Sequence, residues 1–432
     1  MPRRHPKTPA LPPRAALRHL PRLVRAWLAT VQPTLAPLTV ALLLAILLPG
    51  CAEEFQPHPF SVRDSAGVQI VLNGTGAPLP VRHLGDPVVE IGRLEGDVPY
   101  LLHRVVDATL LADGSVAILD GSAEVRLFDA EGTWVRSFGG EGDGPGELRR
   151  PQHLWPVGDS IAVYQGAGAR LTVFPLDGSA PRVATPPTDV GAAFLSAWHL
   201  GPAPVIPQRS TTSLGQRLAE ATHAGNAVSL TYTRLAPDGG PPDTLTTIAN
   251  GTEHRMEFTV AGRTLATMSQ PMLQGSAQAA GGAERFHVGQ GMRPAVAVHD
   301  ITGRRFREIQ WDTTAVPVTT AVREHYIAAT ADRIVASAED MARFPFADSL
   351  PHFDRLATDS DGGLWVRRFA LAPDTLVQRW MVFDTAGVRT AAAELPAGFR
   401  LFQPAGRRVL GLVADSLGVQ RVVMAPLVDA GG

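Results

Sequence analysis

The stretch DGSVAILDGSAEVRLFDAEGTWVRSFG, residues Asp113–Gly139, decides the fold of this chain. It reads as a turn, a short apolar strand, a loop, an alternating strand ending in Phe, an Asp-Gly-type turn and another strand. The stretch GDSIAVYQGAGARLTVFPLDGSAPRVA, residues Gly158–Ala184, follows the same order when Val116 is aligned with Ile161, 45 residues later. The sequence therefore predicts a repeated unit built from short strands.

Further copies of this unit follow toward the C-terminus. A third copy, within Asp361–Ala393, has DGGLWVRRF followed by VQRWMVFDTAGVRTAAA. Weaker copies lie at Val228–Ile248, Ala295–Trp311 and Arg408–Leu427. Self-similarity at a period of roughly 40 to 50 residues, with four short strands in each unit, is typical of a β-propeller. We therefore expect an all-β fold.

Two segments resemble a known family. RLFDAEGTWVRSFGGEGDGPGEL (residues 126–148) and DSDGGLWV (residues 359–366) are similar to NHL-type and related six-bladed β-propellers. The resemblance implies a six-bladed β-propeller of four-stranded blades, which we place at residues 60–428. The first five blades are expected at Arg104–Phe138, Arg149–Thr185, Phe194–Ile248, Met256–Trp311 and Asp354–Leu395.

The sixth blade has only three evident strands after Leu395, so its outer strand must come from elsewhere. Two N-terminal segments, Val68–Leu72 and Val88–Ile91, are strand-like, and either would close the ring and remove an exposed sheet edge. Thr319–Met341 breaks the strand pattern, and its Ala, Glu, Arg and Ile content predicts a short helical insertion near 319–341. The insertion either carries specificity or only packs against a face of the propeller.

The first 50 residues read as an export signal. They contain seven cations and no acid, and they end in LAPLTVALLLAILL (residues 35–48), whose 14 residues suit a signal peptide better than a spanning helix. LPGC (residues 48–51) resembles the bacterial lipobox, in which the Cys is lipidated. We expect a lipoprotein signal peptide at 1–50, lipidation of Cys51 and a lipidated tether at 51–59. The alternative is an uncleaved N-terminal anchor helix.

The position after the Cys predicts the location. Ala52 stands there, and in Gram-negative sorting the lipoprotein resemblance implies that a residue other than Asp directs the protein to the outer membrane. We therefore expect a protein of the bacterial cell envelope, held by a lipid anchor at a membrane, on its periplasmic or surface face.

Composition excludes several classes of protein. With 45% hydrophobic and 19% charged residues, the chain is not disordered overall. It has 41 acidic and 39 basic residues, and seven of the basic ones lie in the signal region, so the rest is acidic and no nucleic-acid partner is expected. A single Cys excludes an intramolecular disulfide framework and a cysteine-cluster metal site.

Several histidines lie at or just before predicted first strands, which line the axial channel of a propeller. They are His103, His153, His199 and His352. Converging imidazoles would bind a transition metal or act as a base, but the repeat alignment equates His153 with Ala108 and so does not bring them into one register. We predict instead a polar binding funnel that includes His103, Arg104, Gln152, His153, His352, Asp354 and Arg355.

No catalytic residue and no metal ligand is assigned, since no G-x-S-x-G, H-E-x-x-H or Walker motif is present. The loop 139–147 (GGEGDGPGE) is a candidate for Ca²⁺ through Glu141, Asp143 and Glu147; the alternative is an ordinary turn between blades. A resemblance to six-bladed lactonases, which hold axial Ca²⁺, fails because Asn occurs only at Asn73, Asn226 and Asn250.

The sequence therefore favours a non-catalytic envelope propeller that binds a protein, a small molecule or a carbohydrate. The alternative is an axial-metal-dependent hydrolase of the lactonase kind, and a purely structural envelope protein is the third class.

Overall fold

A computed structural model describes residues 59–76, 78–166, 170–184, 198–209, 225–236, 240–260, 263–330, 337–371 and 377–429. These residues belong to one structural unit, Pro57–Gly432. The predicted signal peptide, Cys51 and all but the last residue of the predicted tether lie outside the described residues. None of the described helices is long and apolar enough to cross a membrane.

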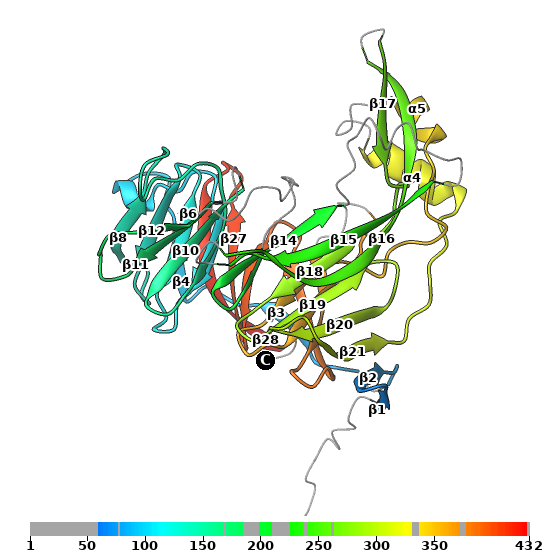
Figure 1. Cartoon of the computed structure of the whole chain (residues 1–432), viewed down its shortest axis with the longest axis horizontal. Helices are drawn as coiled ribbons and strands as arrows, with labels where there is room; N and C mark the ends of the chain where they lie inside the picture. The colour runs from blue at the N-terminus through cyan, green and yellow to red at the C-terminus, as the bar shows by residue number, and fades with distance from the viewer. Residues whose placement is uncertain are drawn as a thin grey trace, which may run out of the picture. The chain divides into compact units, whose positions relative to one another are not determined.

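Within the described residues the strands form six antiparallel groups in chain order, each a meander in which consecutive strands pair (Figure 1). The first three groups are β5(Asp107–Leu110), β6(Val116–Asp120), β7(Glu124–Phe128) and β8(Trp134–Gly139); β9(Pro151–Pro156), β10(Ser160–Gln165), β11(Arg170–Pro175) and β12(Arg182–Ala184); and β13(Trp198–Leu200), β14(Ala203–Arg209), β15(Asn226–Arg234), β16(Asp243–Val260) and β17(Arg263–Ser269).

The remaining three groups follow the same plan. They are β18(Ala277–Gly281), β19(Arg285–Gln290), β20(Ala295–Asp300) and β21(Arg305–Trp311); β22(Phe353–Thr358), β23(Leu364–Arg368), β24(Val377–Phe383) and β25(Arg389–Pro396); and β26(Arg400–Ala405), β27(Arg408–Ala414) and β28(Gln420–Asp429) with an N-terminal strand.

The Asp-Gly turns read from the sequence connect the strands as expected. Between β7 and β8, the Asp129 carboxylate accepts hydrogen bonds from the backbone N–H groups of Glu131 at 3.1 Å and Thr133 at 2.7 Å. Gly132 supplies the left-handed conformation of this turn, with φ of +83°. The side chain of the aspartate and the backbone of the glycine thus explain why Asp and Gly recur at this spacing at strand ends, as at Asp300 and Gly303.

Apolar clusters fill the spaces between consecutive groups. Leu119 and Phe174, for example, belong to the cluster between the first and second groups, whereas Ile118, Phe128 and Leu410 belong to the one between the sixth and the first. The inner strands β5, β9, β13, β18, β22 and β26 also contact one another in succession, and β26 returns to β5. The fold is therefore a β-propeller, as predicted.

The N-terminal segment completes the sixth group. β4(Val89–Ile91) pairs antiparallel with β28, through Val422–Met424, and in Figure 1 it lies in blue beside the red C-terminal strands. β3(Val81–Leu84) lies between β25 and β28. Of the two predicted closing segments, Val88–Ile91 therefore takes the outer position of the sixth group.

The other candidate, Val68–Leu72, does not close the sixth group. It belongs to β2(Val68–Asn73), which forms a hairpin with β1(Phe60–Ser65) and pairs in parallel with β21, on the outer edge of the fourth group. Asn73 fixes this addition, because its buried side chain donates to the carbonyls of Gln310 at 3.1 Å and Gly387 at 3.0 Å.

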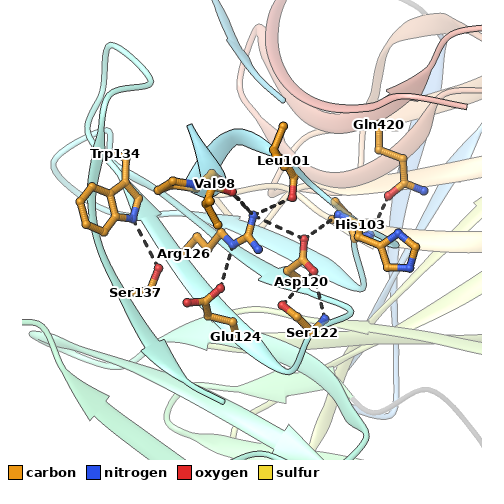
Figure 2. A network of polar contacts seen from close by, with 12 residues as sticks. Val98, Leu101, His103, Asp120, Ser122, Glu124, Arg126, Trp134, Ser137 and Gln420 are labelled. Carbon is orange, nitrogen blue, oxygen red and sulfur yellow. Dashed lines mark hydrogen bonds and ion pairs between the residues drawn. The ribbon is translucent and has the colours of Figure 1, made fainter. Parts of the chain in front are cut away.

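A buried arginine holds the segment that leads from β4 into β5, which includes the short 3₁₀ helix η1(Val98–Tyr100). Figure 2 shows Arg126 beneath this segment: its Nη1 donates to the carbonyls of Val98 at 3.3 Å, Pro99 at 3.1 Å and Leu101 at 2.9 Å. Its Nε pairs with Glu124 at 3.0 Å. One side chain thus ties the closing segment to β7.

One expected blade boundary is wrong, and the expected helical insertion is confirmed. β16 runs without a break from Asp243 to Val260, so Met256 belongs to the third group rather than opening the fourth. The predicted helical insertion is confirmed by α4(Thr320–Thr330) and α5(Ala338–Arg343), and the hydroxyl of Ser337 caps α5 by accepting from the Asp340 N–H at 3.1 Å.

Candidate functional site

The inner strands of all six groups surround a cavity of about 590 Å³, which we name the axial cavity. Its walls combine charged, amide, hydroxyl and apolar side chains. Residues from every inner strand line it: Asp107 and Thr109 of β5, His153 of β9, His199 of β13, Ala279 and Gly281 of β18, Arg355 and Thr358 of β22, and Phe402 and Gln403 of β26.

A chain of three polar side chains runs along one wall of the axial cavity. The Asp107 carboxylate contacts Nδ1 of His153 and also accepts a hydrogen bond from the Leu154 N–H at 3.1 Å. Nε2 of His153 lies 3.2 Å from Nδ1 of His199. The Trp155 indole stacks on the His199 ring with centroids 5.6 Å apart. Both nitrogens of His153 are therefore already engaged.

These three residues lie in successive groups, each 46 residues after the one before, and Asp107 and His153 occupy equivalent places in their hairpins. Asp107 pairs with Leu119 across its hairpin, and His153 pairs with Tyr164 in the same way. The turn between the first two strands is one residue shorter in the second group, which shifts the inner strand by one position. The sequence alignment, which equated His153 with Ala108, is corrected by this pairing.

His199 is uncharged at neutral pH. Burial, and to a smaller extent the positive charge that His153 carries when protonated, lowers the pKa of His199 to about 3. The Asp107 carboxylate accepts from Nδ1–H of His153. When His153 is uncharged, its Nε2 accepts from Nδ1–H of His199, so both hydrogen bonds point from His199 toward Asp107.

Arg355 supplies a cation to the lining of the axial cavity. Burial lowers its pKa, as do the nearby Arg367 and Arg400, while Asp107 opposes the shift. Its Nη2 donates to the carbonyl of Leu401 at 3.0 Å, and the described residues give its other guanidinium nitrogens no hydrogen bond. Arg355 therefore keeps free donors at the cavity.

Gln403 lies beside this cation, and sequence reasoning did not identify it. Its side-chain oxygen accepts from the Thr109 hydroxyl at 3.1 Å and from the Leu110 N–H at 3.0 Å. No described residue accepts from its Nε2. Asp107 was also missed, although its place 46 residues before His153 was a usable signal.

Of the seven residues predicted for the funnel, the structure brings two, His153 and Arg355, to the axial cavity. His103 and Arg104 precede β5 and are exposed. The His103 N–H donates to the Asp120 carboxylate at 2.8 Å, and the Arg104 guanidinium lies 3.4 Å from the Gly121 carbonyl.

The remaining three predicted residues also lie away from the lining of the axial cavity. Gln152 is exposed on β9. Asp354 forms an ion pair with Arg367 at 2.7 Å. His352 donates its backbone N–H to the Gly291 carbonyl at 2.8 Å, and burial lowers the pKa of its side chain.

The acidic loop that was a candidate for Ca²⁺ uses its carboxylates within the protein. Asp143 pairs with Arg149 at 2.6 Å, and the Glu147 carboxylate accepts from the Gly144 N–H at 2.7 Å. Glu141 forms an isolated bridge with Leu148. Across the part of the chain that the structure describes, no three His, Cys, Asp or Glu side chains are grouped as metal ligands.

No protein-family model and no curated protein matches this chain. Solved structures that are similar to it include a member of the DUF4221 family from Bacteroides vulgatus, with 9% identity and a TM-score of 0.46 over 87% of this chain and 100% of that one. Others are a putative exported protein from Bacteroides fragilis (10% identity, TM-score 0.40, 83% and 99%) and a calcium-binding regucalcin from Agrobacterium tumefaciens (11% identity, TM-score 0.36, 80% and 96%). The fold assignment rests on the strand pairing described above, not on these likenesses.

Proposed function

We propose that the protein is a lipid-anchored propeller of the bacterial cell envelope that binds a small polar ligand in its axial cavity without catalysing a reaction. The observation that carries this proposal is the half-buried Arg355, which lines the cavity and forms one hydrogen bond with the described residues, to the Leu401 carbonyl. Burying a guanidinium with unused donors is unfavourable unless a partner completes its hydrogen bonds. A ligand in the cavity would be that partner.

The chemistry of the walls favours a carbohydrate. Arg355 and the Nε2 of Gln403 offer donors, whereas Asp107 offers carboxylate oxygens as acceptors. Phe402 contributes an aromatic ring to the same wall, with the Arg400 guanidinium 4.9 Å from its centroid. Hydroxyl groups both donate and accept, so a sugar would use both kinds of wall at once.

A glycan array tests this proposal with detergent-solubilised full-length protein. Gln403→Glu keeps an acceptor for Leu110 but removes the amide donor, so we expect about a tenfold or greater loss of affinity for any bound glycan. Gln152→Glu makes the same chemical change at an exposed position outside the cavity and is the matched control. Equal binding by both variants and the parent protein would exclude the axial cavity.

The lipid anchor is tested separately. Cys51→Ala is expected to leave a longer, unprocessed chain, and labelled palmitate should enter only the parent protein. Free, unmodified Cys51 in the mature protein of the membrane fraction would contradict the anchor and would leave the binding proposal untouched.

The competing hydrolase requires a metal at the axis. His153 already directs one nitrogen to Asp107 and the other to His199, which favours binding over metal ligation. Metal analysis of protein purified in chelator-free buffers distinguishes the two functions. A stoichiometric Ca²⁺ or Zn²⁺ that is lost in His153→Ala would overturn the non-catalytic proposal.

A further inference from the structure

A second cavity, of about 490 Å³, lies between the third and fourth groups and shares no lining residue with the axial cavity. We name it the lateral cavity. One wall is β16, and the other is formed by β19, β20 and β21. Its lining consists of Thr246, Thr247, Ile248, Ala249, Gly251, Val288, Gly289, Gln290, Arg293, Ala295, Ala297, His299, Arg305 and Glu308.

Small side chains on both walls explain why this space is open. β16 presents Ala249 and Gly251, and the facing strands present Gly289, Ala295 and Ala297. Beside the cavity, the same boundary is filled by large apolar side chains such as Leu230, Leu245 and Phe286, as close-packed protein interiors usually are. The lateral cavity therefore has an apolar body of the size in which small-molecule ligands bind.

One side chain in the lateral cavity has an unused hydrogen-bonding atom. His299 is only 4% exposed, and its ring stacks on Phe286 with centroids 4.7 Å apart. Its Nδ1 is buried, and no described residue forms a hydrogen bond with it. Burial, and to a smaller extent the nearby Arg305, lowers the pKa of His299 to about 4, so the ring is uncharged at neutral pH. Leaving a buried ring nitrogen without a hydrogen-bond partner is unfavourable, and an atom of a bound ligand would supply that partner.

The charges at the same cavity add up to a net cation. Glu308 is 8% exposed and forms an ion pair with Arg305. Arg293 also lines the cavity, and none of the described residues forms an ion pair or a hydrogen bond with its guanidinium. Two guanidinium groups facing one carboxylate leave one positive charge unbalanced, which a single anionic group would neutralise.

We propose that the lateral cavity binds an organic monocarboxylate, with its carboxylate at Arg293, Arg305 and the ring of His299 and its apolar part between β16 and β20. This site is independent of the carbohydrate proposed for the axial cavity. We prefer an organic carboxylate to an inorganic anion because the small apolar residues leave room for the apolar part of an organic acid, which an inorganic anion lacks. Glu308, next to Arg305, disfavours dianions such as phosphate monoesters, because like charges repel.

The test is calorimetric titration of the solubilised full-length protein at neutral pH with benzoate and octanoate. Benzamide and octanamide, which lack the charge, are the matched probes. We expect at least one acid to bind and its amide to bind about tenfold more weakly or not at all. Arg293→Ala should weaken binding of the acid about tenfold, whereas Arg408→Ala, which removes an equal charge from an exposed site in the sixth group, should not.

A second variant fills the space itself. Ala297→Leu places a larger side chain in the lateral cavity and should abolish binding of the acid while leaving glycan binding at the axial cavity unchanged. Failure of both acids to bind, equal binding of an acid and its amide, or unchanged binding in both Arg293→Ala and Ala297→Leu would each overturn the proposal. If Ala297→Leu does not fold, binding of the acid by Arg293→Ala, which changes an exposed residue, still decides the outcome.

Discussion

Two boundaries between sheets differ in how completely they are filled. At the boundary of the sixth and first groups, which we name the seam, Ile91, Ile118 and Val422 pack with no measurable exposure, and a borrowed strand completes the sheet. At the boundary of the third and fourth groups, Leu230, Leu245 and Phe286 pack in an apolar cluster, but small residues face each other across the lateral cavity beside it. The second boundary is therefore filled over part of its area and open over the rest.

The difference shows where dense packing is needed. The seam must hold a ring closed, and polar contacts reinforce it: the Gln420 side chain accepts from the Val105 N–H at 2.7 Å, and Arg400 donates to the Val105 carbonyl at 3.1 Å. The third and fourth groups follow each other directly in the chain, so their boundary, which we name the lateral boundary, tolerates open space beside its apolar cluster. We infer that the part of the lateral boundary around the cavity is free for binding.

The largest expected effect comes from removing the borrowed strands. Deletion of Phe60–Gly92 removes β1 to β4 and exposes the edge of β28. We expect loss of cooperative folding, because the free energy of unfolding of a typical domain is only about 5–15 kcal/mol. Urea unfolding followed by circular dichroism measures it. Deletion of β1 alone, Phe60–Ser65, is the control, because all six of its residues are exposed. An unchanged urea midpoint in the long deletion would show that the seam does not need these strands.

Acid should weaken the lateral boundary before the seam. Burial lowers the pKa of His299, which lines the lateral cavity, to about 4, below the ordinary value of 6.5. Between pH 4 and 6.5 the unfolded chain therefore binds more protons than the folded one, so stability is full above pH 6.5 and falls as the pH drops toward 4. His299 contributes about 3 kcal/mol to the loss as an order of magnitude.

Hydrogen exchange as a function of pH checks this order. Amides of β19 and β20 should lose protection at a higher pH than those of β27 and β28. His299→Phe, which keeps a ring against Phe286, should flatten the fall in stability between pH 6.5 and 4. The same slope in the variant and the parent protein would remove His299 from the explanation.

A single buried cation should also be important for the seam. Arg126→Met leaves the carbonyls of Pro99 and Leu101 without a donor and the carboxylate of Glu124 without its cation, so we expect a loss of about 3 kcal/mol. Thermal and urea unfolding measure it. Arg63→Met, on the exposed β1, is the matched control. If the two variants unfold alike, the network in Figure 2 does not stabilise the seam.

The sequence allowed the seam to be predicted because it depends on counting. The repeat from Asp113 supplies four strands per unit and the last unit has three. Val68–Leu72 and Val88–Ile91 were both available, and only the second closes the ring. The long β16 was not predicted, because the repeat is weak there and nothing in the pattern marks Ile248 as the middle of a strand.

The axial cavity was predicted only in part. His153 and Arg355 were identified because both lie on strands predicted to be innermost, and the innermost strands line the channel of a propeller. Asp107 was missed because the exact register of an inner strand depends on the length of the following turn, where one residue changes which side chain faces inward. The lateral cavity depends on how two sheets face each other, which periodicity does not show.

The smallest expected effect is also the most direct comparison of the two boundaries. Val422 at the seam and Val288 at the lateral cavity are both buried, with 0% and 2% exposure. Val422→Ile adds one methyl group to a filled space, so we expect a loss of about 1–2 kcal/mol from overpacking. Val288→Ile has open space beside it, so we expect a change within about 0.5 kcal/mol of zero. Urea midpoints of the two variants measure the difference, and an equal loss at both positions would mean that the lateral boundary is packed as tightly as the seam.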